Sequence, residues 1–319
     1  MIYGLSGIMD PGALPWNDVG GFLRRQFGGR VSKVLVNTGR PCPHRASGGG
    51  CVFCDEESIL PSYLHSSLPV AEQVRRGIEA RKRRGAIAGC IVYFQRGTYT
   101  AAPVEVLRRE FQEALSVSGV VALAVGTRPD CLPAPVIELL AGLASRRPLF
   151  VDVGLQSAHP ETLDRIRRGH DAADFESAVT QLAALPGVLP IAHMILGLPG
   201  EDAPMMRASF RWIARLPLHG VKIHHLQVVR DTPLEDDYRA GRIQLITQAD
   251  YVPLLADVLE ELPADFVIHR LVGDQPAPVL LAPRWTWSKQ QVRQALVNEF
   301  KRRGTRQGAR AGGCQTTAY

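Results

Sequence analysis

Apolar, β-branched segments alternate with amphipathic segments along most of the 319 residues. The alternation predicts six strands, at residues 31–37, 90–94, 120–125, 149–155, 189–196 and 220–228. The helices predicted between and after them lie at 70–84, 103–115, 135–144, 160–168, 174–185, 203–216, 234–240 and 248–262. Strands joined by helices need crossover connections and therefore form a parallel sheet. Six units fall short of a closed eight-unit barrel, so we expect an α/β fold of the partial (β/α)6, TIM-like open-barrel type.

The ends of the chain differ from this core. Residues 1–30 form a polar N-terminal lead, residues 31–263 the core domain, and residues 264–303 an extension with one strand, at 266–272, and a helix. The glycine, arginine and threonine content of residues 304–319 predicts a basic, flexible tail. Open parallel sheets and barrels carry their functional groups beyond the C-terminal ends of the strands, so we expect the site there.

Three of the six cysteines cluster in the loop after the first predicted strand. Cys42, Cys51 and Cys54 have the spacing C-x8-C-x2-C, and glycines at 48–50 let the backbone wrap closely around a bulky ligand. Three thiolates suit a [4Fe–4S] cluster whose fourth iron stays open for the amino and carboxylate groups of S-adenosylmethionine (SAM). A structural zinc ion, with His44 as fourth ligand, is the alternative.

Basic residues gather in two places, and the formal net charge is +6. Such runs bind phosphate groups in nucleic-acid-binding proteins and are also common on solvated surfaces. They favour a polyanion such as RNA as a partner, with a plain solvated surface as the alternative. The first run is Arg75, Arg76, Arg81, Lys82, Arg83 and Arg84, and the second is Lys289, Arg293, Lys301, Arg302, Arg303, Arg306 and Arg310.

The sequence also bears on the compartment. No apolar run reaches the roughly 18 residues needed to cross a bilayer, and the first residues lack the basic and apolar regions of a signal peptide. Six cysteines in 319 residues are too few for a disulfide framework. We therefore expect a soluble, cytoplasmic protein with no membrane partner. The oligomeric state is not indicated.

Several motifs occur in an order that is typical of one family. They are RQFGGRVSKVLVNTG, CPHR followed by GGGCVFC, YFQRGTYT, GTRPDCL, DVGLQSAHPETLDRIRRGH, HMILGLPGE and LLAPRWTWSK. With these motifs, residues from about 22 to 303 resemble the YhcC/YtqA-type family of radical SAM proteins (MnmL-like), which is related to the Elongator-type radical SAM group. The first two cysteines stand closer together here than is usual in that family, which should alter the shape of the loop more than the ligation.

The resemblance implies SAM-binding roles for residues at the strand ends. A Gly-Gly-Glu-like motif that meets the SAM amino group is replaced here by residues 94–97, in which Gln95 is the substitute. Arg168 resembles the arginine that pairs with the SAM carboxylate, and a surface helix cap ahead of Gly169 is the alternative. The other positions implied to contact SAM are Phe53, Thr127, Arg128, Gln156, Ser157, Ile195 and Gly197.

A few residues are candidates for the substrate pocket. Asp130 either reaches SAM or the substrate, or simply pairs with Arg128. His224, His225 and Gln227 lie near the end of the sixth predicted strand. For the two histidines the alternative is an inward-facing ring with a purely packing role. Cys90, within a strand, and Cys314, in the tail, are assigned to packing or to an incidental position and not to metal binding. Cys131 follows a strand end, where it could face the pocket. No residue is assigned a catalytic role.

The resemblance also implies an activity. Radical SAM enzymes cleave SAM reductively and generate a 5′-deoxyadenosyl radical, with electrons from a low-potential donor such as flavodoxin or ferredoxin. Members similar to Bacillus-type MnmL proteins convert carboxymethylaminomethyl-uridine to aminomethyl-uridine at the tRNA wobble position. We expect the same tRNA substrate here, with the hydrogen taken from the carboxymethyl CH2 group and the amine released by oxidation to an imine and hydrolysis.

Other functions remain open. The first alternative is a radical SAM enzyme that acts on a peptide or a small metabolite. The second is a non-enzymatic, zinc-bound RNA-binding protein. A SAM methyltransferase with a Rossmann sheet is disfavoured, because it would leave the cysteine loop unexplained.

Overall fold

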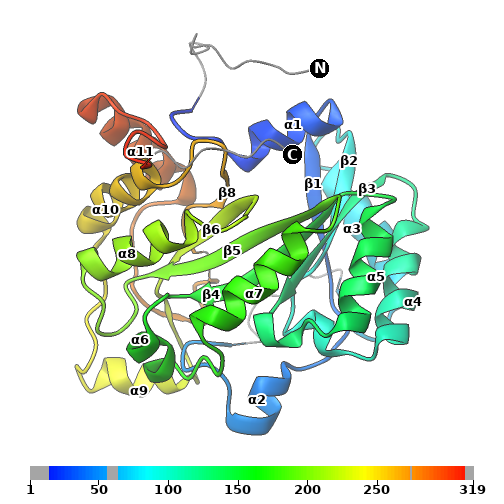
Figure 1. The fold of residues 1–319 in the computed structure, drawn as a ribbon, viewed down its shortest axis with the longest axis horizontal. Coiled ribbons are helices and arrows are strands. Elements are labelled where there is room, and N and C mark those ends of the chain that lie inside the picture. Colours follow the sequence, from blue (N-terminus) through cyan, green and yellow to red (C-terminus); the bar gives the residue numbers. More distant parts are fainter. Residues whose placement is uncertain (1–13, 56–63, 274, 313–319) are drawn as a thin grey trace.

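The core of the protein is a curled sheet of seven parallel strands (Figure 1). The computed structural model describes residues 14–55, 64–273 and 275–312. The sheet keeps the order of the sequence from one edge to the other, and its first and last strands form the edges of an open barrel. The strands are β1 (Val31–Val36), β2 (Gly89–Phe94), β3 (Val120–Thr127), β4 (Leu149–Gln156), β5 (Val188–Leu196), β6 (Gly220–His225) and β8 (Val267–Arg270).

Crossover helices cover the outer face of this sheet (Figure 1). Their apolar faces and the outward side chains of the strands form the largest cluster of buried side chains. Both faces of β4 are buried, which explains its almost continuously apolar sequence LFVDVGLQ. The helices are α3 (Val70–Lys82), α4 (Val104–Leu115), α5 (Ala134–Ala144), α7 (Ala172–Ala183), α8 (Ala203–Ile213) and α10 (Gln248–Glu261).

Short elements decorate the C-terminal ends of the strands. Because each begins within a few residues of a strand end, these elements bring side chains close to the opening of the barrel. They are the helices α2 (Pro43–Gly48), α6 (Pro160–Arg165) and α9 (Pro233–Arg239), and the 3-10 turns η1 (Tyr99–Ala101) and η2 (Pro129–Cys131). None of the helices in the described part of the chain combines the length and the apolar character that a membrane span requires.

Helix α1 (Val19–Phe27) lies at the other end of the strands, opposite α2 (Figure 1). Asp18 caps the helix, since its carboxylate accepts hydrogen bonds from the amides of Gly20 and Gly21. Leu23 packs inside the barrel against Phe150 and other inward side chains. The N-terminal lead thus contains a folded helix, which lies against both edge strands, β1 and β8.

The predicted C-terminal extension is part of the sheet. β8, within the strand predicted at 266–272, pairs in parallel with β6, so the sheet gains a seventh strand from beyond residue 263. The predicted strand 220–228 divides into β6 and a short β7 (Val228–Val229), which pairs antiparallel with β9 (Leu280–Ala282). Helix α11 (Lys289–Arg303) packs against α10.

Residues 304–312 of the predicted flexible tail make specific contacts with the rest of the fold, whereas residues 313–319, including Cys314, lie outside the described residues. Gln307 is 3% exposed. Its side-chain amide donates to the carbonyl oxygens of Pro263 and Phe266 and accepts from the amide of Asn17, at 2.6, 2.9 and 2.9 Å. One glutamine therefore connects this segment to the lead and to the start of β8, through contacts that the composition of the tail does not reveal.

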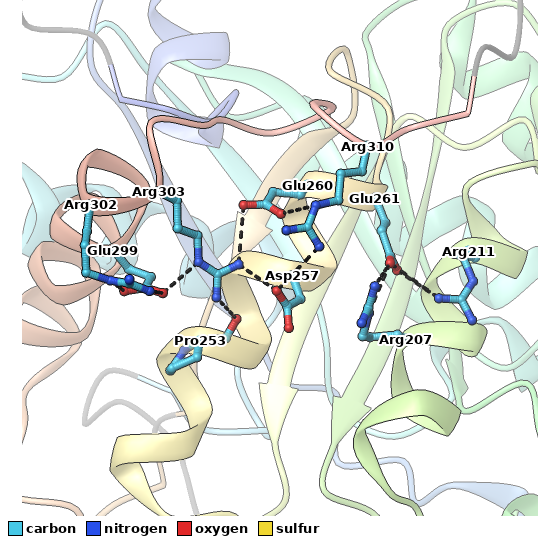
Figure 2. A network of polar contacts seen from close by, with 10 residues as sticks. All are labelled: Arg207, Arg211, Pro253, Asp257, Glu260, Glu261, Glu299, Arg302, Arg303 and Arg310. Carbon is cyan, nitrogen blue, oxygen red and sulfur yellow. Dashed lines mark hydrogen bonds and ion pairs between the residues drawn. The ribbon is translucent and has the colours of Figure 1, made fainter.

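Two arginines of the second basic run form ion pairs with α10 (Figure 2). Arg303 lies 2.6 Å from Asp257 and 3.3 Å from Glu260, and its Nε lies 2.7 Å from Glu299. Arg310 Nε lies 2.8 Å from Glu260, whose side chain is fully buried. These two guanidinium groups neutralise acidic residues of the protein itself, so they contribute little to a phosphate-binding arm.

We predict that Arg303→Ala destabilises the fold by about 2 to 3 kcal/mol, because a buried carboxylate that loses a charged partner keeps its desolvation cost. Arg302→Ala is the matched control on the same helix. Arg302 is 71% exposed and pairs only with Glu299 among the described residues, and an exposed pair contributes at most about 0.5 kcal/mol. Urea denaturation of both variants measures the difference, and equal losses would contradict the assignment.

Candidate active site

A cavity of about 460 Å³ opens at the C-terminal ends of the strands. Its volume lies within the range of about 300 to 1,000 Å³ that is common for small-molecule sites. The cavity brings together most of the residues expected from the sequence. Those that line it are Cys42, Cys51, Cys54, Phe53, Gln95, Thr127, Arg128, Gln156, Arg168, Ile195, His225 and Gln227, together with His44 and His224.

The cysteine loop is held in place by its backbone. Cys42 precedes helix α2, which ends at two glycines with left-handed φ angles, Gly49 at 79° and Gly50 at 74°. A Cβ at Gly50 would lie 3.2 Å from the Arg45 side chain, so any other residue here would be strained both by this contact and by the left-handed φ. The glycines, which were predicted to let the backbone wrap around a ligand, thus end helix α2 and lead the chain back to Cys51.

Two polar groups approach the cysteine sulfurs. Arg168 Nη1 donates to Cys51 Sγ at 3.3 Å, and Thr98 Oγ1 lies 3.1 Å from Cys42 Sγ. Donors of this kind favour the thiolate form and tune the electronics of a sulfur-ligated centre. A four-iron cube places each thiolate on a different iron, so the three sulfurs need not converge on one point.

His44 lines the same cavity, but its ring is engaged elsewhere. Its Nε2 lies 2.7 Å from the carbonyl oxygen of Arg167 and is assigned as the donor of that hydrogen bond. Within residues 14–55, 64–273 and 275–312, no three histidine, cysteine, aspartate or glutamate side chains are arranged to hold a single metal ion.

Two polar side chains meet in the cavity near the end of β4. Helix α6 ends at Arg165, three residues earlier than predicted, so Arg168 lies in the loop beyond it. Arg168 Nη2 donates to the carbonyl oxygen of Gly154 at 2.7 Å. It is therefore buried and is not a surface helix cap. Gln156 has a left-handed φ of 81°, at a bulge in the pairing with β5.

Both side chains keep an unsatisfied atom. Gln156 Oε1 and Arg168 Nε are buried without a hydrogen-bond partner among the described residues. An unpaired buried polar atom costs about 1 to 3 kcal/mol, and a polar ligand in the cavity would remove that cost. Gly154, which sequence analysis missed, makes room for both, since a Cβ there would lie 2.4 Å from Arg168 Nη2 and 2.8 Å from Gln156 Nε2.

The Arg128 guanidinium is occupied by hydrogen bonds within the protein. It forms two hydrogen bonds of 2.9 Å with the Asp130 carboxylate, so the pairing alternative is the one observed. It also donates to the carbonyl oxygens of Arg168 and Gly169 at 2.8 and 3.1 Å. Arg128 thereby holds the loop that carries Arg168. Asp130 does not line the cavity.

Two predicted SAM contacts lie outside the cavity lining. Ser157 is fully buried and donates to Glu201. Gly197 has a φ of 84°, and its close neighbour is Ile246, which a Cβ would approach to 2.8 Å. Both residues therefore pack at the turn after β5 and do not form part of the cavity wall. Cys131 does not line the cavity either.

The histidines after β6 are packed differently from one another. The ring of His225 stacks on Trp285 with a centroid distance of 4.0 Å, and burial lowers the pKa of His225 to about 4. His224 lies with its ring 4.3 Å from that of His193 and accepts a hydrogen bond from Arg270 Nη1 at 2.9 Å. Gln227 lies close to Gly273 at the rim.

Deeper in the barrel lies a charged layer that sequence analysis missed. Lys222 forms a buried ion pair with Asp152 and donates to the Tyr93 hydroxyl at 2.7 Å. Burial alone would raise the pKa of Asp152, but the neighbouring lysines lower it. The available signal was the presence of single charged residues at inward positions of otherwise apolar strands, since such residues are rarely buried without a partner.

Comparison with known proteins identifies the family of the chain. Residues 36–213 match the Radical SAM superfamily, and residues 218–302 match the Radical_SAM C-terminal domain. The chain is 36% identical to Bacillus subtilis YtqA over 90% of its own length and 89% of YtqA. It is 23% identical to the tRNA uridine(34) acetyltransferase of Methanocaldococcus infernus, over 81% of this chain and 54% of that protein.

A solved structure shares the fold. Methanocaldococcus infernus Elp3 with an N-terminal deletion superimposes with a TM-score of 0.68 at 20% identity, over 87% of this chain and 64% of that one. The sheet order also differs from that of a Rossmann methyltransferase, because no strand order reverses.

These matches confirm the resemblance inferred from the motifs, and they remove the zinc-bound, non-enzymatic alternative. The chain belongs to the YhcC/YtqA-type family of the radical SAM superfamily, enzymes that cleave SAM reductively with a [4Fe–4S] cluster.

Proposed function

We propose that this radical SAM enzyme modifies the wobble uridine of tRNA, converting carboxymethylaminomethyl-uridine to aminomethyl-uridine. The observation that supports a SAM site most directly is the set of three cysteines and two unsatisfied polar side chains around one cavity. When bound, the cluster and SAM supply a 5′-deoxyadenosyl radical, which removes a hydrogen atom from an unactivated carbon.

Different lining residues of the cavity would hold the cluster and SAM. Cys42, Cys51 and Cys54 hold the cluster, and the three thiolates leave one iron for SAM. Arg168 and Gln156 offer a donor and an acceptor that the protein itself leaves unused and that suit the charged and hydroxyl groups of SAM. Apolar wall is available for the adenine at Phe53 and Ile195, and Gln95 lies at the rim for the SAM amino group.

Support for tRNA comes from relatives and from the cavity mouth. A similar protein is a tRNA uridine(34) acetyltransferase. Arg45, on helix α2, and Arg167 are exposed beside the cysteine loop. Arg45 Nη1 donates to the carbonyl oxygen of Cys54 at 2.7 Å, and its other N–H groups could contact phosphates. The basic run at the end of α3 is less well placed, because Arg81 and Arg84 contact Lys33 and Arg30 at the opposite ends of the strands.

A different substrate, a peptide or a small metabolite, is the competing proposal. The observation that favours it is the engagement of Arg303 and Arg310 in ion pairs, which reduces the basic surface available to RNA. Salt dependence separates the two proposals, since binding to tRNA weakens steeply as salt rises.

The cysteine assignment predicts that Cys42→Ala, Cys51→Ala and Cys54→Ala each lose the cluster, because two thiolates cannot hold it stably. Iron and sulfide analysis of anaerobically reconstituted protein provides the measurement. Cys131→Ser is the control, since its side chain lies outside the cavity lining. Loss of iron from Cys131→Ser, with retention in Cys42→Ala, would contradict the assignment.

For the SAM site we predict that Gly154→Ala binds SAM about ten- to a hundredfold more weakly and keeps its iron. The new methyl group displaces Arg168, whose charge-assisted hydrogen bond contributes about 1.5 to 3 kcal/mol. Equilibrium dialysis with labelled SAM measures the effect. The control is Gly142→Ala on α5, where a Cβ meets nothing within 4 Å. Wild-type SAM affinity in Gly154→Ala would remove Arg168 from the site.

The substrate assignment is tested by anaerobic incubation of the reconstituted protein with SAM, reductant and bulk tRNA. We expect 5′-deoxyadenosine to form while carboxymethylaminomethyl-uridine falls and aminomethyl-uridine rises, as measured by mass spectrometry of digested nucleosides. Formation of 5′-deoxyadenosine with unchanged nucleosides would reject tRNA and keep the enzyme class.

A further inference from the structure

The inner end of the cavity brings three basic side chains together with one carboxylate. Its lining includes Asp152 and Arg270, and Lys222 lies directly behind, paired with Asp152. Lys33 adds a third cation, with Nζ 5.5 Å from the centroid of the Tyr93 ring, while Lys222 Nζ lies 4.3 Å from the same centroid. Three basic side chains from β1, β6 and β8 and one carboxylate from β4 thus belong to the described part of this layer.

The histidines of the layer do not change this balance. Burial lowers the pKa of His193 to about 3 and that of His224 well below its ordinary value, so both rings are neutral. Burial lowers the pKa of Lys222 to about 7 and also lowers the pKa of Lys33, although the Asp152 carboxylate opposes both shifts. The lasting positive charge of the layer is therefore that of the Arg270 guanidinium. A guanidinium without an ionic partner in a barrel interior is unfavourable, and a bound anion would relieve it.

Arg270 is the group best placed to bind such an anion. It lies on β8 opposite Lys222 in the register and is half-buried. Its Nη1 donates to His224 Nε2, which assigns the proton of that ring to Nδ1. Among the described residues no carboxylate lies within ion-pairing distance of Arg270, whereas the Asp152 carboxylate already pairs with Lys222. A guanidinium keeps its charge at any pH relevant here and matches a carboxylate with two parallel N–H groups.

We propose that Arg270 binds a carboxylate of the substrate at the inner end of the cavity, so that the substrate class is one whose reacting carbon lies next to a carboxylate. This inference rests on the proposed function and deepens it, because the carboxymethylaminomethyl side chain has such a carboxylate bonded to the CH2 group. Held at the inner end, the carboxylate places that CH2 group between Arg270 and the cofactor side of the cavity.

The arrangement also gives Lys222 a separate task. Lys222 does not line the cavity, and it contacts Asp152 and Tyr93. It is therefore a positioning residue: by pairing with Asp152 it keeps that carboxylate from neutralising Arg270. The bound substrate then meets an arginine whose charge is not already compensated.

The test uses two small probes that differ in one group, N-methylglycine and its amide, with cluster-loaded protein and SAM. We expect N-methylglycine to bind the wild type at least tenfold more tightly than the amide, as measured by ligand-observed NMR. Arg270→Gln should abolish this preference, and Arg270→Lys should keep part of it. Arg293→Gln, an exposed arginine on α11, is the control and should bind as the wild type does.

Several outcomes would overturn the inference. Equal binding of the two probes by the wild type would do so, as would an unchanged preference in a folded Arg270→Gln variant. A loss of SAM binding in Arg270→Gln would assign the arginine to the cofactor. Thermal denaturation establishes whether each variant is folded. If Arg270→Gln does not fold, the probe preference is measured with Arg270→Lys.

A parallel assay with tRNA separates this inference from the proposed function. If the probe preference depends on Arg270 and tRNA nucleosides stay unchanged, the carboxylate subsite stands and the wobble uridine is rejected. If tRNA is converted and Arg270→Gln converts it with an unchanged KM, the tRNA function stands and the subsite is rejected.

Discussion

The Arg128 guanidinium is the interaction on which the site depends. It leaves the end of β3, pairs with Asp130, and holds the carbonyl oxygens of Arg168 and Gly169 in the loop after α6. Arg168 in turn contacts Gly154 at the end of β4 and the sulfur of Cys51. Charge-assisted hydrogen bonds in a buried setting are strong and directional, so one side chain fixes the relative positions of two strand ends and the cysteine loop.

The interior of the barrel changes character along its axis. Near α1 it is apolar, with Leu23 packed against Phe150. The middle layer holds the Lys222–Asp152 pair, and the outer layer holds the cysteines and polar side chains. A charged layer between an apolar floor and a cofactor site lets the same barrel be stable at one end and selective for a ligand at the other.

The sequence predicted the strands well because each is a short apolar run between clear helical segments. It also predicted that the cysteines of the glycine-rich loop after the first strand belong to one site, and all three line the same cavity. It failed where contacts depend on the closure of the barrel. The charged layer joins side chains from different strands, and no local pattern reveals that Lys222 meets Asp152 or that Gln307 reaches Pro15 and Phe266. The placement of Ser157 outside the cavity was missed for the same reason.

The contacts that residues 304–312 make with distant parts of the chain influence the order in which the chain folds. Gln307 joins the segment before α1 to the start of β8, across some 290 residues of sequence. Contacts of such long range form late, because the chain must first lose the entropy of a large loop. During synthesis, β1 to β6 can assemble while α11 is still unmade. The edge strand that carries Arg270 is then locked only when the last described turn docks, so a radical-generating cavity is completed after the rest of the sheet has already formed.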